Sequence, residues 1–162
     1  MNARGDAGSP LEWTESLGFH IKRAEQAIAA RKAEIFRNLG LTVPQAMALC
    51  LLLDAPPKSC THLSRESYVT SQTMTGIIGK LEAAQLVLRH PSADHARVHL
   101  FELTEKGHEL ATQARILGMG LEEELLDAVA PDARAPLLAT LSRLADLAPE
   151  AGTMSEPAAR RS

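Results

Sequence analysis

The sequence predicts a mainly α-helical chain with one small β-hairpin, and three observations favour this fold class. Aromatic residues make up only 3% of the chain while aliphatic residues are plentiful, a composition that suits packed helices. Two strand-like runs, residues 86–90 and 97–103, flank a polar, turn-forming tip. Just before them, apolar residues recur at the i, i+3, i+4, i+7 spacing of one buried helix face: Met74, Ile77, Ile78 and Leu81.

A shorter helix is predicted just before this one, over residues 61–68, with Leu63 facing inward and His62 and Arg65 outward. Thr70 can cap the helix that follows, because its hydroxyl can accept a hydrogen bond from a free backbone N–H group. Helix, turn, helix and hairpin, in this order, are the outline of a winged helix-turn-helix. In that fold the second helix enters the major groove of DNA, and the hairpin, or wing, reaches the neighbouring backbone or minor groove.

The predicted helix that follows Thr70 has an unusual face for a solvent-exposed surface, on the side opposite its apolar stripe. This face carries small or hydroxylic side chains and one charge, whereas ordinary solvent faces favour Glu and Lys. Gly76 and Gly79 on this face each cost about 1 kcal/mol of helix stability relative to alanine. Close approach of the helix backbone to a large partner would account for that cost, although a purely structural, solvent-facing helix is the simpler alternative.

Long helices are predicted on both sides of this core. The first covers residues 11–39 and ends at Gly40. It is longer than a small recognition domain needs, so we expect part of its apolar surface to bind a second subunit. Its apolar stripe consists of Leu17, Ile21, Ala24, Ile28, Ile35 and Leu39.

The remaining helices follow from caps and prolines. Thr42 and Gln45 have the spacing of a capping box and open a buried scaffold helix over residues 42–53. After the wing, Thr104 can cap a second long helix that runs up to Pro131. A last helix follows, and Pro136 implies that it begins late or is kinked.

These patterns predict a single domain between two unstructured ends. Within the domain we expect a DNA-binding lobe and two sets of dimerisation helices. The expected boundaries are a flexible arm over residues 1–10, the domain over 11–148, the DNA-binding lobe over 42–107, dimerisation helices over 11–40 and 104–148, and a disordered tail over 149–162.

Composition excludes several other classes. The formal net charge of −3 means that a DNA-binding surface must be local and balanced by acidic regions elsewhere. No run is apolar enough to span a membrane, and the first residues lack the apolar core of a secretory signal, so we expect a cytoplasmic protein. Cys50 and Cys60 have no C-x-x-C spacing, which argues against a disulfide framework.

No catalytic signature is present, so we expect a protein that is not an enzyme and needs no cofactor. Cys60 and His62 are two residues apart at a helix start, where side chains seldom face one another, and no carboxylate is placed to orient the histidine. His95 and His99 are four apart but on a hairpin, where that spacing does not form a metal site as it does on a helix. We therefore predict no metal.

The motifs between residues 41 and 107 resemble the MarR family of bacterial transcription regulators, and a looser likeness covers residues 11–147. That family has an L-T-x-x-Q helix, a T-x-T recognition helix ending in L-E, a wing with D-x-R, and a following L-T-x-x-G. This chain departs from the pattern at three positions. His95 takes the place of the wing aspartate, Gly76 replaces a longer polar or basic residue, and Gln85 replaces a common glycine. The matching residues are Leu41, Thr42, Gln45, Thr73, Thr75, Leu81, Glu82, Arg97, Leu103, Thr104 and Gly107.

The resemblance implies a homodimeric regulator, most simply a repressor, that binds a pseudopalindromic operator in double-stranded DNA. A small aromatic or acidic effector would bind between the dimerisation helices and the DNA-binding lobe and release the DNA. Candidate effector residues are Trp13, His20, Met47 and Leu51. Candidate DNA-binding residues are Thr61, His62, Ser71, Gln72, Thr73, Thr75, Gly76, Lys80, His95 and Arg97.

Two alternative functions use the same fold. The acidic net charge and the thinly charged recognition face are compatible with a winged-helix module that binds proteins and not DNA. Cys60 near a helix N-terminus is compatible with a thiol redox-sensing regulator, because that environment lowers the pKa of a thiol.

Overall fold

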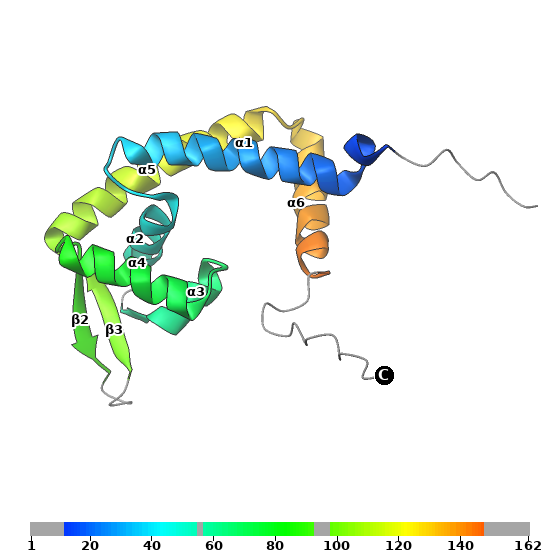
Figure 1. Ribbon diagram of the computed structural model, residues 1–162. Helices are drawn as coiled ribbons and strands as arrows, with labels where there is room; N and C mark the ends of the chain where they lie inside the picture. The colour runs from blue at the N-terminus through cyan, green and yellow to red at the C-terminus, as the bar shows by residue number, and fades with distance from the viewer. Residues whose placement is uncertain (1–11, 55–56, 93–97, 148–162) are drawn as a thin grey trace, which may run out of the picture. The chain divides into compact units, whose positions relative to one another are not determined.

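The computed structural model describes residues 12–54, 57–92 and 98–147 of the protein (Figure 1). They belong to two compact units, Met1–Leu121 and Glu122–Ser162, which are described separately below. Among the described helices, none combines the length and the apolar character that crossing a membrane requires. The predicted arm and the predicted tail lie outside the described residues, and the single domain over 11–148 stays a prediction.

The first unit contains the predicted helix-turn-helix and hairpin, which confirms the mainly α-helical fold class with a small sheet. Its core consists chiefly of side chains from α2, α4 and α5, with Leu49, Leu63 and Met74 among the fully buried residues. The elements are η1 (Trp13–Glu15), α1 (Leu17–Arg37), α2 (Val43–Asp54), β1 (Lys58–Ser59), α3 (Cys60–Glu66), α4 (Ser71–Ala83), β2 (Val87–Pro91), β3 (His99–Leu103) and most of α5 (Glu105–Asp127).

The sheet has three antiparallel strands in the order β1-β3-β2. The hairpin of β2 and β3 was predicted, and in Figure 1 it projects away from α4. Strand β1, whose Lys58 pairs with Phe101, was not predicted. Lys58 is only 8% exposed, and its Nζ donates a 2.6 Å hydrogen bond to Glu66 Oε2 at the end of α3. The ion pair satisfies the buried ammonium and joins β1 to the helix-turn-helix.

The first long helix begins later than predicted. Residues Trp13–Glu15 form a separate 3-10 turn, and Ser16 caps α1 by accepting a hydrogen bond from the N–H of Phe19 at 3.2 Å. The first half of the predicted apolar stripe is uncovered, since Leu17 and Ile21 are exposed, whereas Ile35 and Leu39 pack against the core. Phe36, which was outside the stripe, is the one residue of α1 that is buried.

Glycine ends α1 as predicted. Gly40 has a φ of 70°, and the N–H of Leu41 donates to the carbonyl of Phe36 at 3.0 Å while that of Gly40 donates to Arg37 at 2.9 Å. This pair of bonds is a Schellman motif, which satisfies the last free carbonyls of a helix. Phe36 and Leu41 are both buried, so the motif also closes one edge of the core.

The same motif ends α3 and α4, but with residues other than glycine in the left-handed position. These residues are Tyr68, with φ 55°, and Gln85, with φ 58°. A side chain in this backbone region costs about 1–2 kcal/mol, because Cβ approaches the following carbonyl oxygen. Gln85, which stands where the family usually has glycine, is therefore expected to lower the stability of the fold.

We expect Gln85→Gly to stabilise the protein by about 1 kcal/mol, because it removes this backbone strain. Part of the gain is offset by the greater freedom of glycine in the unfolded chain. Gln85 is exposed, so the substitution leaves the core packing intact. Urea unfolding followed by circular dichroism measures the change, with Gln113→Gly on an exposed turn of α5 as the control that should lose stability. An unchanged or lower unfolding midpoint for Gln85→Gly would contradict the expected relief of strain.

The second unit contains the end of α5 and α6 (Pro131–Ala145). Of the two alternatives expected for α6, the late start is wrong, because the helix begins at Pro131 and includes Pro136; the kink stays a prediction. Pro131 is tolerated at the first helical position, where its missing N–H group would have no helical partner, whereas Pro136 lies inside the helix and removes one backbone hydrogen bond. None of the residues of α6 is buried, and Leu137, Leu138 and Leu141 are exposed on it.

Candidate nucleic-acid interface

The candidate interface is centred on α4, which is held in place from its cap and its apolar face. Thr70 Oγ1 accepts a 3.1 Å hydrogen bond from the N–H of Thr73, which confirms the predicted N-cap. Met74, Ile78 and Leu81 are buried, so three turns of the helix are anchored in the core. The opposite face is therefore fixed in orientation and open to a partner.

All six predicted DNA-binding residues on α4 are exposed: Ser71, Gln72, Thr73, Thr75, Gly76 and Lys80. Their polar groups are not equally free. Thr73 Oγ1 lies 2.8 Å from Thr70 Oγ1, and Thr75 Oγ1 donates a 2.8 Å hydrogen bond to the carbonyl of Ser71. These bonds leave the methyl groups of the two threonines as the parts best able to meet a partner.

Gln72 and Lys80 differ from the threonines, because neither side chain has a hydrogen-bond partner among the described residues. A free glutamine amide can pair with both N6 and N7 of adenine in the major groove, which is a specific contact. A free ammonium suits a phosphate, which attracts it without regard to sequence. The helix thus carries one group able to read a base and one able to bind the backbone.

The two glycines of the exposed face are not required by packing inside the chain. A Cβ atom added at Gly76 or Gly79 would meet nothing within 4 Å. Both positions also lie within the helix, where glycine is unfavourable. Their small size therefore keeps the outer surface of α4 flat, as expected from the sequence for a helix that lies close to a large partner.

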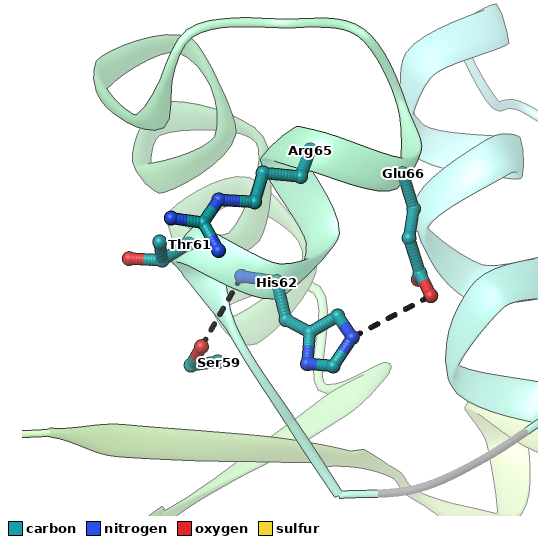
Figure 2. Close-up of a pocket in the computed structure, with 5 residues that line it drawn as sticks. All are labelled: Ser59, Thr61, His62, Arg65 and Glu66. Atoms are coloured by element: carbon teal, nitrogen blue, oxygen red, sulfur yellow. Dashed lines mark hydrogen bonds and ion pairs between the residues drawn. The ribbon is translucent and has the colours of Figure 1, made fainter.

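The outer face of α3 adds an open depression of about 360 Å³ lined by Ser59, Thr61, His62, Arg65 and Glu66. Figure 2 shows Thr61 and Arg65 on one side, while the His62 ring points toward Glu66. His62 Nε2 is 3.7 Å from Glu66 Oε1, and the other oxygen of this carboxylate accepts from Lys58. Because Glu66 is already paired, the Arg65 guanidinium is the dominant uncompensated charge of the depression.

Thr61 and His62 were predicted at this interface, whereas Arg65 was predicted only to face outward. Arg65 is exposed and lies beside both of them along the depression. Its predicted outward position, on the helix next to the recognition helix, could have identified it as a DNA-binding candidate from sequence. A guanidinium and a hydroxyl together make a surface that can bind phosphate oxygens.

The base of the wing is described, but its tip is not. His90 Nε2 lies 2.7 Å from Glu102 Oε1 on the neighbouring strand, and the guanidinium of Arg89 lies 5.8 Å from the centre of the Phe101 ring. Arg89 thus has a structural contact of its own. His95 and Arg97 lie outside the described residues, so their predicted roles remain predictions from sequence.

The surroundings of both thiols raise their pKa. Burial raises the pKa of Cys50, and the nearby Arg115 guanidinium opposes this only in part. Burial likewise raises the pKa of Cys60, against a smaller lowering by a hydrogen bond with Thr75. A raised pKa keeps a thiol protonated at neutral pH, whereas the thiolate is the reactive form.

The candidate effector residues come from three elements, η1, α1 and α2. Trp13 and His20 are exposed on η1 and α1, and Met47 and Leu51 lie one turn apart on α2. Their joint role stays a prediction. Over residues 12–54, 57–92 and 98–147, no three His, Cys, Asp or Glu side chains are grouped so that they could hold a metal ion.

The sequence is similar to a family model and to curated proteins. A family model described as "MarR family" matches residues 39–98, which begin just before α2 and end just before β3. The "HTH-type transcriptional repressor Rv2887" of Mycobacterium tuberculosis is 30% identical over 110 residues, which are 68% of this chain and 79% of that protein.

Two solved structures extend the likeness to three dimensions. The transcriptional repressor CouR bound to a 23-mer DNA duplex has a TM-score of 0.74 and 26% identity, covering 85% of this chain and 97% of CouR. Rv2887 in complex with p-aminosalicylic acid has a TM-score of 0.62 and 27% identity, covering 80% of this chain and 97% of Rv2887.

Proposed function

The chain belongs to the MarR family of transcriptional regulators, and from this premise we propose that it is a homodimeric, DNA-binding repressor that a small ligand releases. The observation that carries the proposal is the exposed face of α4, which is flat at Gly76 and Gly79 and offers the free amide of Gln72. The family membership already separates the chain from enzymes. Its proposed target, genomic DNA, puts it in the cytoplasm.

In the proposed complex α4 enters the major groove and Gln72 pairs with a base, while Lys80 and Arg65 meet phosphates. The likeness to CouR, which has been solved on a DNA duplex, supports this arrangement. Two copies of the chain related by a two-fold axis would read two half-sites of a pseudopalindrome. Arg97 at the wing tip would add a further backbone or minor-groove contact.

The proposed ligand is a small aromatic acid. Its support is the likeness to Rv2887, which has been solved with p-aminosalicylic acid and with salicylic acid. Trp13, His20, Met47 and Leu51 are the proposed contacts, because they combine aromatic, apolar and titratable groups on the elements outside the recognition helix. A ligand of this kind releases DNA only if it binds the released conformation more tightly than the DNA-bound one.

Uncovered apolar surface supports the proposed homodimer. In the first unit Trp13, Leu17 and Ile21 are exposed on consecutive turns of η1 and α1, and in the second unit Leu137, Leu138 and Leu141 are exposed on α6. Monomeric proteins seldom leave contiguous apolar patches of this kind in water. A second copy of the chain would bury them.

We therefore expect sedimentation equilibrium to show a dimer at micromolar concentration. Ending the chain at Ala130 removes α6 and should cause dissociation or aggregation, because it removes the exposed leucines of α6 that a second copy would bury. The control is a chain that ends at Leu147, which keeps α6 and should remain dimeric. A well-folded monomer of the full chain would contradict the proposal.

Base reading and phosphate binding can be separated by salt titration of DNA affinity. Gln72→Ala should leave the slope of log K against log salt unchanged but relax discrimination at one base pair of each half-site, by about 1–3 kcal/mol. Lys80→Gln should weaken all sequences alike. It should also make the slope shallower, by about 1 for each phosphate that is no longer neutralised, or about 2 for a dimer.

The probes are the region upstream of the chain's own gene and an unrelated duplex of equal length. Lys32→Gln, at a partly exposed position of α1, is the matched charge control and should leave the slope unchanged. If the wild-type chain binds both duplexes weakly and alike, DNA-specific repression is the wrong function and a protein-interaction module becomes the better interpretation.

A further inference from the structure

The turn between α3 and α4 contains Tyr68, which is the only tyrosine of the chain. Its φ of 55° places it in the left-handed region, at the position of a Schellman motif where glycine is favoured. The chain uses glycine at the same position after α1, where Gly40 has a φ of 70°. A tyrosine at this position destabilises the turn unless its side chain makes compensating contacts.

No such contact exists within the described part of the chain. The side chain of Tyr68 is 95% exposed, and neither its hydroxyl nor its ring has a partner among the described residues. The neighbouring Val69 packs against the core and fixes the turn, so the ring is held outward by its own backbone. A strained and uncovered aromatic residue points to a contact outside the chain.

The position of the turn indicates which contact this is. Tyr68 precedes the N-cap of α4 by two residues, and Ser71 and Gln72 follow at the start of that helix. In a helix-turn-helix the first residues of the second helix approach the bases, so the preceding turn lies beside the DNA backbone. A tyrosine hydroxyl can donate a hydrogen bond to a phosphate oxygen, and the ring can lie against a deoxyribose.

We propose that Tyr68 is a DNA-backbone contact that fixes the position of α4 in each half-site. The proposal rests on the DNA-binding function proposed above and adds a residue that is neither charged nor on a helix. Its contact is uncharged, so it contributes to affinity without contributing to the salt dependence of binding.

Two variants of Tyr68 and one control test the proposal. The probe is a duplex that the wild-type chain selects from a randomised double-stranded library. Tyr68→Gly should raise the melting temperature by about 2–4 °C, because it removes the strain. The same variant should weaken binding of the selected duplex about tenfold or more. Tyr68→Phe keeps the ring and should weaken binding about threefold to tenfold because one hydrogen bond is removed, with an unchanged salt slope.

Gln85→Gly is the matched control, because it removes the same strain at the other end of α4. It should raise the melting temperature without changing affinity. A second readout uses the single tyrosine directly: tetranitromethane should nitrate Tyr68 in the free protein, and the bound duplex should protect it, as measured by mass spectrometry.

The ways in which the proposal can fail are distinguishable. Wild-type affinity in Tyr68→Gly, or unprotected nitration in the complex, overturns the role of Tyr68 while DNA binding stands. A melting temperature of Tyr68→Gly below that of the wild type overturns the strain argument and the proposal with it. If the library yields no selected duplex, the proposed DNA-binding function fails first, and Tyr68 has no DNA to contact.

Discussion

Gly107→Ala is expected to destabilise the protein by about 3 kcal/mol or more, which is a large share of the roughly 5–15 kcal/mol that typically separates a folded domain from its unfolded state. A Cβ atom at this position would lie 1.9 Å from the carbonyl oxygen of Leu86 and 2.9 Å from its carbonyl carbon. Both neighbours are backbone atoms, so no side chain can rotate away to make room. Relief would require α5 to move away from the start of the wing.

The Leu86 carbonyl is itself held in place, which makes such a movement costly. It accepts a 3.1 Å hydrogen bond from the N–H of Thr104. The hydroxyl of Thr104 donates to the carbonyl of Gln85 at 2.9 Å and accepts from the N–H of Gly107, also at 2.9 Å. Thr104 and Gly107 thus connect the end of α4, the start of β2 and the first turn of α5, which is a physical reason for the L-T-x-x-G motif.

Gly118→Ala is the matched control on the same helix. A Cβ there would meet Phe36 Cζ at 3.7 Å, an ordinary van der Waals distance, so the substitution should be neutral or stabilise by up to about 1 kcal/mol. Urea unfolding by circular dichroism compares the two variants directly. If Gly107→Ala were as stable as the wild type, the first turn of α5 would be able to move away from the Leu86 carbonyl at little cost, which would contradict the prediction.

Local signals in the sequence were sufficient for the recognition helix. The apolar spacing from Met74 to Leu81 and the capping side chain of Thr70 act within a few residues, so they determine both the buried face and the start of α4. The capping box of Thr42 and Gln45 is equally local, and the N–H of Thr42 does donate to Gln45 Oε1 at 2.9 Å. Such features survive folding because tertiary contacts reinforce them.

Features that depend on distant partners were missed. Strand β1 has two residues, too few for any periodicity, and exists because Lys58 pairs with Phe101 far along the chain. The burial of Phe36 likewise depends on the turn at Gly40 and on α5 nearby, not on helical spacing within α1. Left-handed backbone at Tyr68 and Gln85 was not predictable, because neither residue type favours it.

For the candidate site, sequence identified the exposed face of α4 but not which of its groups are free. The hydroxyl of Thr75 is used by the helix itself, and that of Thr73 by the cap, whereas Gln72 is uncommitted. Only three-dimensional contacts make this distinction. They also brought Arg65 into the interface, through a depression shared with Thr61 and His62.

Gly79→Glu is expected to abolish DNA binding, with affinity reduced by about 100-fold or more, while the protein stays folded. Placing a like charge against the phosphates costs several kcal/mol, and 100-fold corresponds to about 2.7 kcal/mol. The side chain has room in the free protein, because a Cβ at Gly79 meets nothing within 4 Å. Glutamate also forms helix better than glycine, so thermal stability should not fall.

A series at this one position separates shape from charge. Gly79→Ala adds only a methyl group, should stabilise the helix by up to about 1 kcal/mol, and measures how closely DNA approaches the backbone. Gly79→Gln has nearly the size of glutamate without its charge, so the difference between the two variants is electrostatic and should shrink as salt is raised. Fluorescence anisotropy on operator DNA gives the affinities, and circular dichroism checks folding. Wild-type binding by folded Gly79→Glu would show that α4 does not enter the groove, because a negative side chain at the centre of its outer face could not then escape the phosphates.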